Sequence, residues 1–112
     1  MKINKQSLQG KWVEYKPGVK FKIRPYSLFA VNIKPNVQDG DEIESAKSMF
    51  GMFDYSVMDW EGVFDENDEK LECTTENKQM FYEYVQDLAV WIFEQARNIR
   101  DEVVIPEEEV KN

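Results

Sequence analysis

Histidine is missing from this chain, and cysteine occurs only once in its 112 residues, as Cys73. Without histidine, the Ser/His and Cys/His pairs that activate nucleophiles are impossible, and the commonest zinc ligand is missing. A lone cysteine permits no intrachain disulfide and cannot build a structural zinc site. No basic residue adjoins Cys73 to stabilise a thiolate, so we predict a small buried hydrophobe at this position.

Long apolar runs are missing as well. The longest strongly apolar run, Leu88–Phe93, is far too short to cross a bilayer. The N-terminal stretch MKINKQSLQGKW lacks the apolar core of a signal peptide. Glycine-rich phosphate-binding loops of either standard spacing are also absent. We therefore expect a soluble protein that stays in the cytoplasm and has no membrane partner.

Basic residues are fewer than acidic ones: the chain has 14 Lys and Arg residues and 22 Asp and Glu residues, which gives a net charge of -8. Phosphate backbones repel so acidic a chain, so we expect no nucleic-acid partner. Twenty-two carboxylates make chance pairs inevitable, but none forms a recognisable catalytic constellation. We predict a protein that is not an enzyme, with no catalytic residue and no cofactor.

One acidic stretch partly matches a calcium-binding loop. Asp65, Asn67 and Glu69 occupy its first, third and fifth positions. Lys70 then stands where the sharp turn of such a loop requires glycine. We therefore predict a solvated acidic turn over Asp65–Lys70 and no metal site.

The length suits one domain, and a hydrophobic content of 42% suffices for one packed core. We predict a single α+β domain over residues 1–104. Pro106 and the run Glu107–Glu109 predict an acidic, flexible tail over residues 105–112.

Residues 8–24 predict a β-hairpin, because apolar and basic residues alternate from Val19 to Arg24 and Pro17-Gly18 suits a tight turn. Simple pairing across this turn places Trp12 opposite Ile23 and Glu14 opposite Phe21. The second pair is a mismatch that a bulge would relieve.

A further strand is predicted over Tyr55–Phe64, where Gly62 beside Trp60 indicates a bulge or a close approach of another backbone. After the charged turn, Leu71–Cys73 is expected to return as a short strand. The large size of Trp12, Trp60 and Trp91 favours the core for each, with anchoring of a partner as the alternative.

Helical spacing predicts a middle helix over Glu42–Phe53 with Asp41 as its cap, and further helix from Thr75 to about Glu102 behind an N-cap at Thr74. One long helix and two helices separated near Gln86-Asp87 both fit the second pattern. These elements predict an α+β fold. An N-terminal β-hairpin and further short strands form a small antiparallel sheet, which packs with a middle helix and C-terminal helices.

Several segments of the chain follow one another in an order that is more informative than any one of them. A basic strand, Gly18–Pro25, comes first, and the element Trp60–Val63 leads through an acidic turn and a Cys/Thr pair to Glu76–Lys78. A helix with Trp91–Glu94 completes the order. Over most of its length the chain resembles tail assembly chaperones and related small tail proteins of tailed bacteriophages and prophages. It departs from them at Asn67-Asp68, where the family usually has glycine, and in its middle segment.

The resemblance implies a protein that binds the tape-measure or tube protein in the host cytoplasm until tube subunits polymerise. We predict the contact residues on the middle helix, because methionine-rich faces adapt to varied partners. They are Met49, Phe50, Met52 and Phe53. Core packing is the alternative for this stripe. A permanent component of the tail or head–tail junction, and an acidic inhibitor of a host protein, are the alternative functions. The oligomeric state stays open, with a homo-oligomer among the alternatives.

Overall fold

The computed structural model of the chain describes residues 1–27 and 42–106. The helix cap predicted at Asp41 lies outside the described residues. The elements, in chain order, are β1 (Lys2–Ile3), the 3-10 helix η1 (Lys5–Gln9), β2 (Lys11–Lys16), β3 (Val19–Ile23), α1 (Glu42–Ser56), β4 (Val57–Glu61), α2 (Thr75–Tyr84), α3 (Gln86–Asp101) and β5 (Val104–Ile105).

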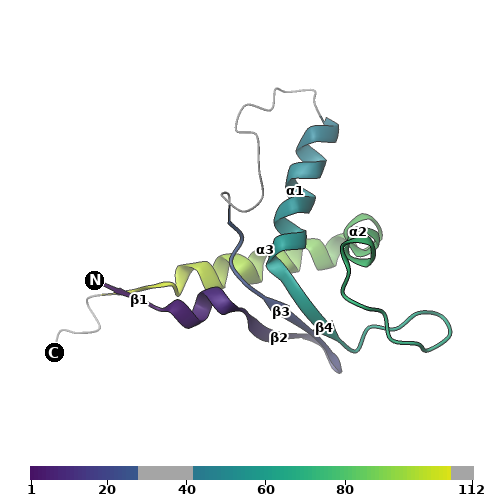
Figure 1. Cartoon of the computed structure of the whole chain (residues 1–112), viewed down its shortest axis with the longest axis horizontal. Helices are drawn as coiled ribbons and strands as arrows, with labels where there is room; N and C mark the ends of the chain where they lie inside the picture. The colour runs from purple at the N-terminus through teal and green to yellow at the C-terminus, as the bar shows by residue number, and fades with distance from the viewer. Residues whose placement is uncertain (28–41, 107–112) are drawn as a thin grey trace.

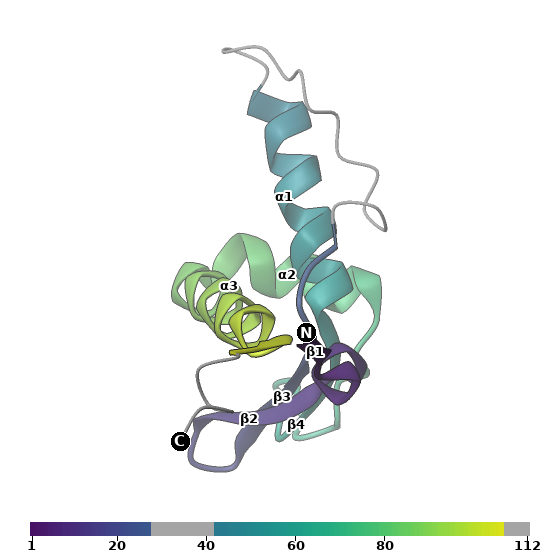
Figure 2. The same cartoon turned by 90° about the vertical axis from the view of Figure 1, so that its left-hand side faces the viewer.

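The predicted α+β class is confirmed. Strands β2, β3 and β4 form an antiparallel sheet in that order, and β1 pairs with β5 in a second, two-stranded sheet. Helix α3 runs across one face of the larger sheet. Helix α1 leads directly into the start of β4, and α2 lies beside the lower half of α1 (Figures 1 and 2).

The hairpin of β2 and β3 is confirmed, but its predicted pairing is wrong by one residue. Trp12 lies opposite Lys22 and Val13 lies opposite Phe21, and the register shifts between Glu14 and Lys16. A bulge at Tyr15 absorbs this shift. The bulge lets Val13 and Tyr15 both pack against the core, whereas Trp12 stays on the other face of the sheet.

Strand β4 is shorter than predicted, because α1 continues to Ser56 and β4 starts at the next residue. The close backbone approach expected at Gly62 is confirmed. Gly62 has a φ of 78°, and a Cβ added there would overlap the carbonyl oxygen of Gly18. The turn that ends β4 therefore lies directly against the turn of the β2–β3 hairpin.

The acidic turn after β4 forms as predicted, held by its own first side chain. Asp65 Oδ1 accepts hydrogen bonds from the amides of Asn67 and Glu69, at 2.8 and 3.0 Å. The return strand predicted over Leu71–Cys73 does not form, and a single bridge between Phe64 and Lys70 closes the turn instead.

Two C-terminal helices, rather than one, follow the turn. The predicted N-cap of α2 is confirmed, since the amide of Asn77 donates to the hydroxyl of Thr74 at 3.1 Å. Val85 breaks the helix with φ −121° and ψ 75°, and it caps α3 without a side-chain hydrogen bond. Asp87 therefore lies in the first turn of α3, where its charge suits the helix dipole.

The two ends of the described chain meet in the smaller sheet. Lys2 pairs with Ile105 and Ile3 with Val104, and the amide of Asn4 donates to the carbonyl of Val103 at 2.7 Å. Ile105, which we assigned to the tail, therefore belongs to a strand. Residues 107–112 lie outside the described residues.

The core fills the space between the larger sheet, α1 and α3. Its buried apolar residues are Phe21, Ile23, Phe53, Val57, Trp60, Leu88, Ala89, Ile92, Ala96 and Ile99.

The three tryptophans have different environments. Trp60 is buried, and its indole Nε1 donates to the carbonyl of Leu71 at 2.7 Å. Trp91 is half-buried and lies 4.8 Å from the ring of Tyr15, centroid to centroid. The core prediction is wrong for Trp12, whose side chain is 40% exposed on the open face of the sheet.

Candidate partner-binding site

The predicted contact residues on α1 divide between the core and the surface. Phe53 is fully buried, so it cannot touch a partner in the folded protein, and we withdraw it from the site. Phe50 is half-buried, with its ring centroid 5.5 Å from that of Tyr82. Met49 is 46% exposed and Met52 is partly buried, so these two methionines remain as surface candidates.

This division follows from what covers α1. The ring of Phe53 lies 5.3 Å from that of Tyr82 on α2 and 6.3 Å from that of Phe93 on α3, measured between centroids. The same burial raises the pKa of the Tyr82 hydroxyl. In Figures 1 and 2, the upper part of α1 rises beyond both α2 and α3. Met49 comes four residues before Phe53, nearer the start of α1, and its side chain is 46% exposed.

A buried lysine fixes α1 against α2. Lys78 Nζ donates to the backbone carbonyl of Asp54 at 2.8 Å and lies 3.1 Å from its carboxylate. The hydroxyl of Thr75 reaches the same carboxylate at 3.1 Å. The Lys78 side chain is only 10% exposed. Its ammonium lies at the last turn of α1, where the helix dipole favours positive charge. The helix that carries Met49 is therefore held in place before any partner arrives.

The open face of the larger sheet is a second surface, which the sequence analysis missed. Trp12 lies at its edge on β2, and the neighbouring rows alternate in charge. The cross-strand rows are Glu14, Lys20 and Glu61, and Trp12, Lys22 and Asp59. Acidic and basic side chains are interleaved here, so this face lacks the dense negative charge expected of an acidic inhibitor that mimics nucleic acid. One sequence feature indicated that Glu14 belongs to this face. In the simple pairing Glu14 would lie opposite the apolar Phe21, whereas the shifted register places it opposite Lys20.

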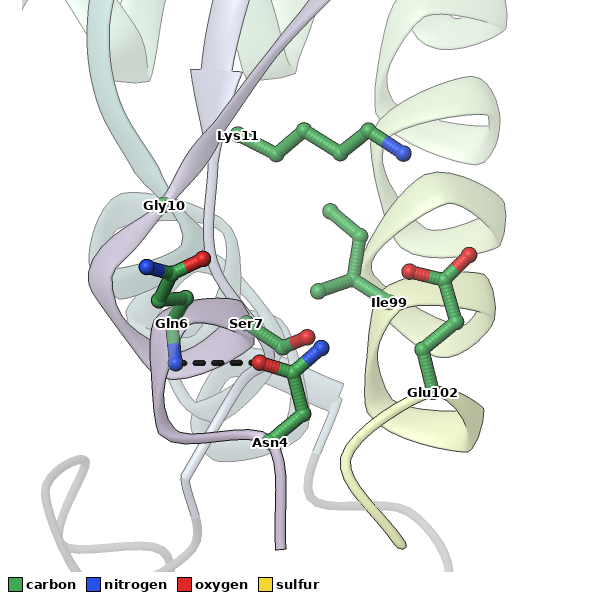
Figure 3. A pocket seen from close by; sticks show the side chains of 7 residues that line it. All are labelled: Asn4, Gln6, Ser7, Gly10, Lys11, Ile99 and Glu102. Carbon is green, nitrogen blue, oxygen red and sulfur yellow. Dashed lines mark hydrogen bonds between the residues drawn. The ribbon is translucent and has the colours of Figure 1, made fainter. Parts of the chain in front are cut away.

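A polar pocket of about 270 Å³ lies between η1, the start of β2 and the end of α3. In Figure 3, the ammonium of Lys11 and the carboxylate of Glu102 extend into it from opposite walls. The side-chain oxygen of Asn4 accepts a hydrogen bond from the amide of Gln6 at 3.2 Å on a third side. Both charged residues are exposed, so water screens their charges, and nothing in this pocket points to a bound ligand.

Cys73 packs against the core, as predicted, but it is half-buried rather than buried. Burial raises the pKa of its thiol to about 11. The ammonium of Lys78 opposes this rise, whereas the carboxylates of Asp59 and Asp54 add to it. The thiol is therefore protonated at neutral pH and suited to packing rather than to nucleophilic chemistry.

We expect Cys73 to be alkylated slowly in the folded protein. At pH 8, a thiol pKa of about 11 instead of 9.0 lowers the thiolate fraction about 100-fold. Iodoacetamide labelling, followed by mass spectrometry in buffer and in urea, measures the difference. Above pH 9, the unfolded chain releases this proton before the folded one, so the thiol lowers folding stability as the pH rises towards 11. Equal labelling rates in the two states would contradict the raised pKa.

Over residues 1–27 and 42–106, no three side chains of the metal-binding types lie close enough together to hold an ion. Within the same two ranges, none of the helices combines the length and apolar character needed to cross a membrane.

Comparisons with known proteins identify no relative. No protein-family model, curated protein or solved structure matches the chain.

Proposed function

We propose that the protein is a non-enzymatic tail assembly chaperone of a tailed phage or prophage. It binds the tape-measure or tube protein in the cytoplasm of the bacterial host before the tail is assembled. The observation that carries this proposal is the exposed side of α1, where Met49 lies on a helix that rises beyond its neighbours (Figure 1). The order of the Trp60–Val63 element, the acidic turn and the capped helix α2 supports it through the resemblance to such chaperones.

The physical basis of the proposal is the match between this surface and a helical partner. An amphipathic helix with an exposed apolar stripe binds a neighbouring apolar surface through side chains at helical spacing. Met49 and Met52 supply flexible apolar side chains that adapt to such a stripe. The net charge of -8 keeps the bound complex soluble, because like-charged complexes repel one another.

Met49→Asp should reduce recovery of the tape-measure or tube protein at least about tenfold, because a carboxylate in an apolar contact loses its hydration. The measurement is a tagged pull-down from phage-producing cells, quantified by mass spectrometry. Val90→Asp is the matched control, because Val90 is an exposed apolar residue on a different helix, α3. Both variants should keep the thermal stability of the parent within a few degrees, since both sites reach solvent.

Purified virions, analysed in parallel, separate a chaperone from a permanent component. A chaperone leaves the complex, so the chain should be absent from finished particles. Its presence there at fixed stoichiometry would make it a structural protein of the tail. If both variants recover the tail proteins as well as the parent does, the α1 site is refuted. If the parent recovers only host proteins, the proposed function itself is refuted.

A further inference from the structure

A second pocket, of about 500 Å³, lies where the last turns of α1 and α3 meet η1 and the segment after β3. This end of the molecule is where α3, β1 and the N-terminus come together (Figure 1). Its volume falls within the roughly 300–1,000 Å³ of pockets that hold small ligands and side chains. The rim is apolar, formed in part by Leu8 and Val104, which are 49% and 54% exposed.

One aromatic wall of this pocket is fixed in advance. The guanidinium of Arg24 lies 3.7 Å from the ring centroid of Tyr55, and its Nε donates to the Tyr55 carbonyl at 2.8 Å. The amide of Arg24 also donates to the carbonyl of Ser56 at 3.0 Å. Two contacts from Arg24 hold Tyr55, and the third fixes Arg24 itself to the end of α1. A wall held in this way loses little conformational entropy when a ligand binds against it.

The charged group of the pocket is Arg100. Its guanidinium lies 5.1 Å from the ring centroid of Tyr26, the second aromatic wall. Among the residues that the structure describes, the guanidinium of Arg100 forms no ion pair with a carboxylate and donates no hydrogen bond. The nearby Glu102 extends into the polar pocket of Figure 3 instead. Arg100 thus offers planar donors at the edge of an apolar, aromatic cavity.

We propose that this pocket binds an acidic peptide segment of a partner protein. A large apolar side chain of the segment enters between Tyr26 and Tyr55, and a neighbouring carboxylate pairs with Arg100. The choice of occupant follows from charge complementarity, because the Arg100 guanidinium is the only charged group among the described residues that line this pocket. The inference goes beyond the proposed function and does not depend on it, since it rests on residues other than those of the α1 site.

The test is an NMR titration of the full chain with two capped peptides, acetyl-Ala-Phe-Glu-Ala-amide and its glutamine counterpart. The methyl signals of Leu8 and Val104 should shift with the acidic peptide, and the glutamine peptide should bind roughly tenfold more weakly. Arg100→Gln should bring the affinity for the acidic peptide down to that for the neutral one. Arg97→Gln is the matched control, since Arg97 is an exposed arginine one turn earlier on α3, outside the pocket, and it should change nothing.

Four results would overturn the inference. Equal binding of the two peptides would show a purely apolar pocket, and unchanged affinity in Arg100→Gln would remove the guanidinium from recognition. Shifts of the same methyl signals with protein concentration alone would identify a second copy of this chain as the occupant. An absence of any shift at millimolar peptide would also refute it. None of these outcomes bears on the tail-protein pull-down, so the two proposals fail separately.

Discussion

Replacing Phe53 with alanine should lower the free energy of unfolding by about 3–5 kcal/mol. Phe53 is fully buried, and its ring packs against Phe50, Tyr82 and Phe93 from three different helices. Removing the ring leaves a cavity at the junction of α1, α2 and α3 that rigid neighbours fill only in part. Because domains of this size are stable by about 5–15 kcal/mol, the variant should be close to unfolding at 37 °C. Urea denaturation followed by tryptophan fluorescence measures the loss.

Met49→Ala is the matched comparison for Phe53→Ala, one helical turn away on the same element. Met49 is 46% exposed, so its truncation should cost less than about 1 kcal/mol. A similar cost at both positions would show that the two sides of α1 are equally covered, contrary to the division of the predicted contact residues. The same comparison explains why Met49, and not Phe53, is the position for a binding test. Loss of binding in a Phe53 variant would report unfolding.

Gly62→Ala should destabilise the protein by about 2–5 kcal/mol. Gly62 has a φ of 78°, a left-handed conformation that costs an alanine about 1–2 kcal/mol. Its added methyl group would also overlap the carbonyl oxygen of Gly18 and lie 2.9 Å from the carbonyl carbon. A backbone neighbour cannot rotate away as a side chain does, so the two turns must separate. Thermal unfolding followed by circular dichroism measures the effect.

Gly18→Ala isolates the conformational part of that cost. Gly18 has a φ of 82°, but a methyl group there would meet nothing within 4 Å. We therefore expect a loss of only about 1 kcal/mol at Gly18, because the left-handed penalty is partly offset by a less flexible unfolded chain. If Gly62→Ala is no more harmful than Gly18→Ala, the close approach of the two turns is wrong.

The position of Gly62 also connects the sheet to the helices that carry the candidate site. The turn at Gly62 leads into the acidic turn and then to Thr74, which caps α2. Lys78 on α2 in turn holds the last turn of α1 through Asp54. Lys78 and Asp54 take no part in the contact between the two turns, so they hold α1 independently of it. We expect Gly62→Ala to weaken partner binding only in proportion to its loss of folded protein.

Local patterns in the sequence were enough to predict several elements. Alternation of apolar and basic residues specified the hairpin, since side chains on a strand point to opposite faces in turn. The hydroxyl of Thr74 and the helical stripe behind it specified the start of α2, because both act within a few residues of each other. The break before α3 and the acidic turn were also indicated by residues at those positions. The absence of histidine and the single cysteine limited the chemistry before any fold was known.

Tertiary structure decided what depends on contacts between distant segments. The sequence analysis placed Met49, Phe50 and Phe53 on one face of a helix, but only the positions of Tyr82 and Phe93 determine which of them are covered. The bulge at Tyr15 moved Trp12 from the expected core to the open face of the sheet. The pairing of Ile105 with Lys2 and the pocket beside Arg100 join opposite ends of the chain. Periodicity gives the face of an element, whereas burial depends on which other element lies against it, and that choice is made by packing the whole chain.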